Sequence, residues 1–218
     1  MLTLATRSAR RFLFIGAHSD DIEIGCGGSV LSLLSGRSEV EVLWVVFSAG
    51  GDRTREAAKS ARALLARGAT ADVRVLDFRT SYFPSQAIEI KDYFETLKPF
   101  APDIVFTHTL GDRHQDHRLL AELTWNTFRN HLVLEYEIPK YEGDLGQPNV
   151  YVPLSAAVAR RKARHVCRHF QTQGNKHWFS EDTFLALARL RGIECAASSG
   201  FAEAFHARKL VLGAADGE

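Results

Sequence analysis

The sequence FLFIGAHSDDIEIGCGG, at residues 12–28, decides the fold. Its first four residues are apolar and predict a short buried strand, and its later glycines are typical of a turn or of the entry to a helix. Between the two, His18, Ser19, Asp20 and Asp21 follow one another directly. One imidazole and two carboxylates at the carboxyl end of a core strand lie where open α/β sheets bind their ligands.

The rest of the chain alternates strand-like apolar runs with helical patterns. Strands are predicted at residues 12–15, 40–47, 72–78, 103–107 and 132–136, and a further one near 207–212. Helices are predicted at residues 29–35, 54–67, 91–97, 118–128, 155–169 and 180–191, and a loop at 139–153. We therefore expect a single α/β domain over residues 1–218, with a Rossmann-like, largely parallel, doubly wound sheet flanked by helices.

A second polar cluster follows the fourth predicted strand. Residues 108–117 read HTLGDRHQDH, with His114, Asp116 and His117 close together. In the doubly wound order 3-2-1-4-5, strands one and four are neighbours at the point where the winding reverses. The sequence therefore predicts that both clusters meet in one crevice, with a metal site at the carboxyl ends of strands one and four.

The residue types in this crevice suit a hydrolytic metal site. His18, Asp21 and His117 would form a three-ligand set that leaves a position open for water, as in catalytic zinc sites. Asp20 is then free to accept a proton from the water and pass it to a leaving group. His114 would stabilise the developing oxyanion or act as an acid, and Asp116 would orient an imidazole.

Simpler interpretations of the same residues remain open. Asp20 and Asp21 also suit the N-terminal cap of a helix, and His114 and His117 suit a polar helix face. The sequence lacks a complete dinucleotide loop, because GxGxxG would need glycine where Val30 stands. The other histidines are expected to be surface or packing residues: His108, His131, His165, His169, His177 and His206.

The composition of the chain limits the cellular compartment and the binding partners that we expect. Hydrophobic residues make up 45% of the 218 residues and the net charge is +1, which gives no general electrostatic case for nucleic acid or an acidic membrane. The three cysteines never form CxxC, and no apolar run approaches the ~20 residues of a membrane span. We expect a cytoplasmic protein with neither a nucleic-acid partner nor a membrane span. Apolar faces on the C-terminal helices favour a homo-oligomer.

The two clusters also carry a family resemblance. AHSDDIEIGCGG (17–28) resembles the AHPDD motif of the PIG-L/LmbE-like family of zinc-dependent N-acetylglucosaminyl deacetylases, and DRHQDH (112–117) resembles its HPDH motif. Between them, GGDRTREAAKSA (50–61) is similar to the family's glycine loop and helix start. Ser19 and Gln115 replace prolines of these motifs, and neither proline is a ligand.

The resemblance implies the same metal set. It assigns His18, Asp21 and His117 as ligands of Zn²⁺ and Asp20 as the general base. Fe²⁺, Co²⁺ or Mn²⁺ would fit the same ligands.

The resemblance also implies roles around the metal. His114 becomes the electrophilic or acid partner, steadied by Asp116. Arg53 matches an arginine that contacts substrate in similar proteins, and Arg55 is a competing alignment.

The expected activity is removal of an acetyl group from a small N-acetylated amino sugar or sugar conjugate of the GlcNAc type, by zinc-activated water. Two alternatives remain at this stage: a non-hydrolytic Rossmann-like module that binds a nucleotide or sugar, and a metal-dependent esterase. Five aromatic residues are candidates for a wall that stacks on a sugar: Tyr82, Phe83, Tyr136, Tyr141 and Trp178.

Overall fold

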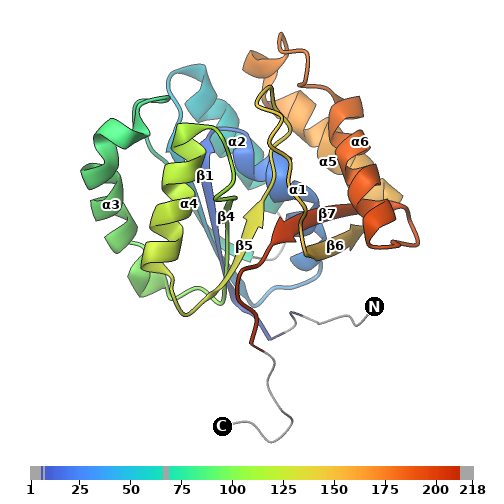
Figure 1. Cartoon of the computed structure of the whole chain (residues 1–218), viewed down its shortest axis with the longest axis horizontal. Coiled ribbons are helices and arrows are strands. Elements are labelled where there is room, and N and C mark those ends of the chain that lie inside the picture. Colours follow the sequence, from blue (N-terminus) through green and yellow to red (C-terminus); the bar gives the residue numbers. More distant parts are fainter. Residues whose placement is uncertain (1–5, 7, 66–68, 212–218) are drawn as a thin grey trace, which may run out of the picture.

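The computed structural model describes residues 6, 8–65 and 69–211 (Figure 1). The strands of this part are β1 (Arg11–His18), β2 (Val40–Ser48), β3 (Ala69–Val75), β4 (Ile104–His108), β5 (Leu132–Tyr136), β6 (Val150–Leu154) and β7 (Phe201–His206). The α-helices are α1 (Asp21–Leu33), α2 (Asp52–Leu65), α3 (Ala87–Glu95), α4 (Gln115–Thr127), α5 (Ala156–His169) and α6 (Glu181–Glu194). Three short 3₁₀ turns are η1 (Phe83–Gln86), η2 (Lys98–Phe100) and η3 (Gln171–Gln173).

All seven described strands belong to one sheet, in the order β3-β2-β1-β4-β5-β7-β6. The first five are parallel, which confirms the doubly wound order 3-2-1-4-5. Antiparallel β7 and β6 extend the sheet beyond β5. The predicted loop at 139–153 is therefore partly wrong, because residues 150–154 form edge strand β6. The last strand covers residues 201–206 instead of 207–212: residues 207–211 form no strand, and Leu212 lies outside the described residues.

Helices cover both faces of the sheet. Figure 1 shows α3 and α4 on one side, with α1, α5 and α6 on the other. The core is divided accordingly: Phe12 and Phe14 pack toward α1, α2 and α5, while Leu13 and Ile15 pack toward α3 and α4. Both faces of β1 are thus apolar, which is why its sequence forms a continuous hydrophobic run. Within the described residues, no helix has the length and apolar character to cross a membrane.

Helix α1 begins earlier than predicted. It starts at Asp21, directly after β1, and bends at Cys26, where φ is −141° and ψ is 15°. The glycines expected at a turn or at the entry to a helix therefore lie inside the helix. A Cβ on Gly25 would come within 2.2 Å of the Tyr136 ring, so glycine is needed for α1 to lie this close to β5.

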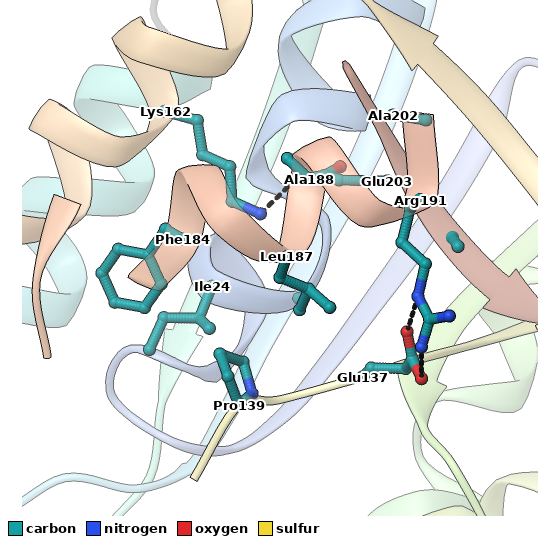
Figure 2. A pocket seen from close by; sticks show the side chains of 12 residues that line it. Ile24, Glu137, Pro139, Lys162, Phe184, Leu187, Ala188, Arg191, Ala202 and Glu203 are labelled. Atoms are coloured by element: carbon teal, nitrogen blue, oxygen red, sulfur yellow. Dashed lines mark hydrogen bonds and ion pairs between the residues drawn. The ribbon is translucent and has the colours of Figure 1, made fainter. Parts of the chain in front are cut away.

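The half of α1 after the bend has its own cap. The carboxylate of Glu203, on β7, accepts hydrogen bonds from the backbone N–H groups of Gly28 (2.8 Å) and Ser29 (2.6 Å). Lys162 of α5 neutralises this carboxylate across 2.5 Å, and both side chains are buried (Figure 2). The ion pair joins α1, α5 and β7, so it fixes the C-terminal part of the chain against the site-bearing half.

Replacing Lys162 by methionine should lower the free energy of unfolding by about 3–5 kcal/mol, because it leaves the Glu203 carboxylate buried without its counter-charge. Urea denaturation measures this loss. Arg161→Met is the matched control, since Arg161 is the exposed neighbour on the same helix. Equal denaturation midpoints for the two variants would show that the ion pair contributes little.

Candidate metal and active site

The carboxyl ends of β1 and β4 lie side by side, and each ends in a histidine. Phe14 pairs with Phe106 in the parallel register, so His18 and His108 emerge at the same edge of the sheet. After β1 the chain turns at once into α1. The carboxylate of Asp21, the first residue of that helix, accepts a hydrogen bond from the backbone N–H of His18 at 2.7 Å. This turn places the two side chains together.

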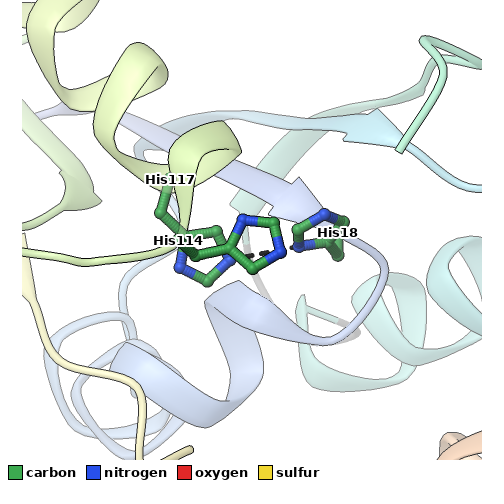
Figure 3. A group of neighbouring side chains, drawn as sticks. All are labelled: His18, His114 and His117. Carbon is green, nitrogen blue, oxygen red and sulfur yellow. Dashed lines mark hydrogen bonds between the residues drawn. The ribbon is translucent and has the colours of Figure 1, made fainter. Parts of the chain in front are cut away.

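Three side chains from the two clusters each bring one atom that can bind a metal into a close triangle. We call these three atoms the donor triangle. His18 Nδ1 lies 3.1 Å from His117 Nε2, and each of these nitrogens lies 3.3 Å from Asp21 Oδ2. Figure 3 shows how His117 and His114, at the start of α4, face His18. Tetrahedral ligands held ~2.0–2.1 Å from a zinc ion are roughly 3.3–3.4 Å from one another. The spacing of the three donors therefore fits one metal ion.

The second nitrogen of His18 is also engaged. His18 Nε2 lies 3.1 Å from Asp116 Oδ2, and the backbone N–H groups of Ser81 and Phe83 donate to the same carboxylate at 2.6 and 3.1 Å. The Asp116 carboxylate was expected to steady His114. It contacts His18 instead, because its position in the first turn of α4 points it toward the end of β1.

His117 has a corresponding partner in Asp112. His117 Nδ1 lies 2.9 Å from Asp112 Oδ2, which is also 3.0 Å from Lys140 Nζ. Lys140 in turn binds both oxygens of Asp144 at 2.7 Å. A carboxylate on one ring nitrogen fixes the tautomer and orientation of a ligating histidine. Sequence reasoning missed Lys140, because it lies in a segment that was expected to be a loop and carries no motif.

The charges around the triangle favour a bound cation. Burial alone lowers the pKa of His117, but the carboxylates of Asp21 and Asp112 outweigh burial and raise this pKa to about 10. Burial also acts to lower the pKa of His18, and Asp21 and Asp116 reverse the shift. The carboxylates of Asp21, Asp112 and Asp116 therefore place negative charge around both imidazoles, and this negative charge favours a bound cation.

His108 belongs to the site, although a surface or packing role was expected for it. Its ring is fully buried and stacks on His117 with centroids 3.9 Å apart. Its Nε2 accepts the backbone N–H of Ala17 at 3.0 Å and lies 3.3 Å from Asp21 Oδ2. In the described residues, two other groups of three also bring their ligand atoms close together, His18 with His114 and His117, and Asp21 with His108 and His117, and both share His117 with the triangle.

Asp20 lies beside the triangle and pairs with an arginine. It is 4% exposed, and its Oδ1 is 3.6 Å from the Arg53 guanidinium, which also donates to Ser19 Oγ at 3.1 Å. Burial and the negative charge of Asp21 raise the pKa of Asp20, and Arg53 partly offsets that increase. Arg55 instead pairs with Asp52, and its side chain is 82% exposed. Of the two competing arginines, the structure brings Arg53 to the site.

His114 caps α4 and presents one nitrogen to the crevice. Its Nδ1 accepts the backbone N–H of Asp116 at 3.2 Å, so the proton of the neutral ring lies on Nε2. Burial and the neighbouring rings of His117 and His18 lower the pKa of His114, which favours this neutral form. His114 is therefore arranged to donate a hydrogen bond through Nε2.

Comparison with known proteins now decides the family. A family model described as GlcNAc-PI de-N-acetylase matches residues 13–128, just over half of the chain. The chain belongs to the PIG-L family. The matched segment carries both histidine clusters, so the expected resemblance is confirmed.

Relatives of this PIG-L family member include several deacetylases. The uncharacterized deacetylase YaiS of Escherichia coli strain K12 is 28% identical over 148 residues, covering 63% of this chain and 79% of YaiS. The N,N'-diacetylchitobiose deacetylase of Pyrococcus horikoshii shares the fold with a TM-score of 0.72 at 21% identity, over 92% of this chain and 84% of its own. The 4-carboxy-2-hydroxymuconate hydratase GalB of Pseudomonas putida KT2440 also shares the fold, with a TM-score of 0.69 at 16% identity over 94% and 98% of the two chains. The fold alone therefore does not determine the reaction.

In this PIG-L family member His18, Asp21 and His117 line a cavity of about 240 Å³. Its walls come from Thr80 and Ser81 after β3, from residues between Ile138 and Glu142 after β5, and from Gln173, Lys176 and Trp178 after α5. Of the candidate stacking aromatics, Tyr141 and Trp178 line the cavity, whereas Phe83 and Tyr136 are buried in the protein interior and Tyr82 is 46% exposed.

Proposed function

We propose that this protein is a metal-dependent N-deacetylase that hydrolyses the acetamide of a small N-acetylated amino sugar or sugar conjugate. The observation that carries the proposal is the donor triangle of His18, Asp21 and His117, with the carboxylate of Asp20 beside it and not among the three donors. Membership of the PIG-L family, whose model is described as a de-N-acetylase, supports the reaction class.

His18, Asp21 and His117 would hold the metal. Two imidazoles and one carboxylate are ligands that Zn²⁺ accepts, and Fe²⁺, Co²⁺ or Mn²⁺ would also suit them. When bound, such an ion polarises the acetamide carbonyl and lowers the pKa of water, so that the water can lose a proton and attack the carbonyl near neutral pH.

The remaining residues move protons and position the substrate. Asp20 accepts a proton from the attacking water as the new C–O bond forms, and then delivers a proton to the nitrogen as the C–N bond breaks. His114 donates a hydrogen bond from Nε2 to the carbonyl oxygen as negative charge develops there. The products are acetate and the free amine of the sugar.

The assay that tests this proposal measures acetate and primary amine together. The metal-replete protein is given a panel of N-acetyl amino sugars, with O-acetyl sugars and an unsaturated hydroxy acid as comparison substrates. The two products should appear in a one-to-one ratio from at least one N-acetyl sugar. Turnover of only the O-acetyl esters would make the protein an esterase, and turnover of only the unsaturated acid would make it a hydratase.

Arg53→Ala should raise KM for the N-acetyl sugar by roughly 10–100-fold, the value of a charge-assisted hydrogen bond, and leave the metal content unchanged. Arg53 lines the cavity, whereas Arg55 on the same helix does not, so Arg55→Ala is the matched control. Steady-state kinetics and elemental analysis on both variants check this expectation. An unchanged KM in Arg53→Ala would remove Arg53 from substrate recognition.

A further inference from the structure

Gln173 is a buried polar side chain that faces the cavity. It is only 3% exposed and lines the same cavity as Asp20 and His114. Its side-chain amide has no hydrogen-bond partner in the described residues. The amide atoms are nevertheless not fully buried, so they keep some contact with solvent. The little surface that Gln173 exposes therefore includes its amide, and Gln173 is one of the residues that line the cavity.

The backbone around Gln173 is fixed from two sides. Its N–H donates to the carbonyl of the fully buried Phe170 at 3.0 Å. The preceding residue, Thr172, donates to Glu56 through its backbone N–H at 3.1 Å and through its hydroxyl at 2.6 Å. Glu56 lies one turn after Arg53 on α2, so these bonds tie the turn that carries Gln173 to the helix that carries Arg53.

The chemistry of an amide indicates what it binds. A primary amide offers two donors and one acceptor, so it matches a hydroxyl group, which both donates and accepts. A carboxylate or phosphate would use only its donors, and a methyl group would use neither. Arg53, which lines the same cavity, offers donors alone. This wall of the cavity therefore suits a polyhydroxylated ring.

We propose that Gln173 is a specificity-determining residue that hydrogen-bonds a ring hydroxyl of the substrate; the inference rests on the proposed function. The hydroxyl belongs to the same sugar that carries the acetamide, because Gln173 lines the same cavity as His18, Asp21 and His117. The side chain distinguishes substrates that carry this hydroxyl from substrates that lack it, and it takes no part in the proton transfers.

The test is a double-mutant cycle in which one change is made in the protein and the other in the substrate. Wild type and Gln173→Met are assayed on the best N-acetyl sugar of the panel and on its singly deoxygenated analogues. We expect wild type to lose at least ~10-fold in kcat/KM on one deoxy analogue, since a buried amide is then left unpaired. Gln173→Met should lose a similar factor on the parent sugar and show no further loss on that analogue.

Controls separate recognition from structure. Gln171→Met changes an exposed glutamine of the same turn and should behave as wild type. Metal content and the urea midpoint should stay unchanged in Gln173→Met. If that variant unfolds, Gln173→Ala decides the matter, because it removes both the donors and the acceptor of the amide and should also lose discrimination between parent and analogue.

The possible results have distinct meanings. A wild type that releases no acetate from any N-acetyl sugar would overturn the proposed function and this inference with it. An active wild type combined with a Gln173 variant that discriminates as wild type does would overturn the inference alone.

Discussion

Replacing Asp20 by asparagine is expected to lower kcat for acetate release by roughly 10²–10⁴-fold, the contribution of a general base, while the metal content stays the same. Asparagine keeps the shape of the side chain but accepts no proton. The carboxylate is well placed for this role because it is buried beside the donor triangle and pairs with Arg53. Its pKa is raised by burial and by Asp21, which moves the base closer to the pH at which it must work.

Two measurements are needed for Asp20→Asn, acetate release under saturating substrate and metal content by elemental analysis. Asp52→Asn is the matched control, because Asp52 is an exposed aspartate whose partner is Arg55. Near-normal turnover of Asp20→Asn would remove the proposed base. Loss of metal from the same variant would make Asp20 a ligand instead.

The central part of the fold was predictable from local sequence because its strands are buried on both faces. Residues 42–47 are apolar and buried at every position, so their apolar character alone identifies the strand. The antiparallel edge lacks this signal. Strand β6 contains Pro153, which an edge strand tolerates, and β7 turns the charged Glu203 inward. That burial depends on Lys162, which is far from Glu203 along the chain, so no local pattern reveals it.

The meeting of the two histidine clusters was predictable, whereas the partners of each side chain were not. Strand order alone brings the end of β1 beside the end of β4, and therefore His18 near His117. Which carboxylate contacts which imidazole depends on the rotation of α4, which turned Asp116 toward His18. The choice of Arg53 over Arg55 likewise depends on where α2 begins, two residues earlier than predicted.

His117→Ala is expected to abolish metal binding, because it removes one corner of the donor triangle and leaves only His18 and Asp21 from the other motif. The wild-type protein should contain about one metal ion per chain. Stripping that ion with a chelator should abolish activity, and returning Zn²⁺, Co²⁺, Mn²⁺ or Fe²⁺ should show which ions restore it. His177→Ala is the matched control, since His177 is exposed and does not line the cavity.

Metal binding can also be followed without any assay of activity. An ion that binds only the folded protein stabilises it by about 2.7 kcal/mol when its free concentration is 100 times Kd. Added metal should therefore raise the unfolding temperature of wild type and of His177→Ala, and leave that of His117→Ala unchanged. His18 and His117 are 99 residues apart in sequence, and their ring nitrogens are 3.1 Å apart in space. If His117→Ala no longer shows a rise in unfolding temperature with added metal, the two motifs form one metal site. If His117→Ala binds a full equivalent of metal with wild-type affinity, the two motifs do not share one metal site. The donor triangle would then no longer support a catalytic metal.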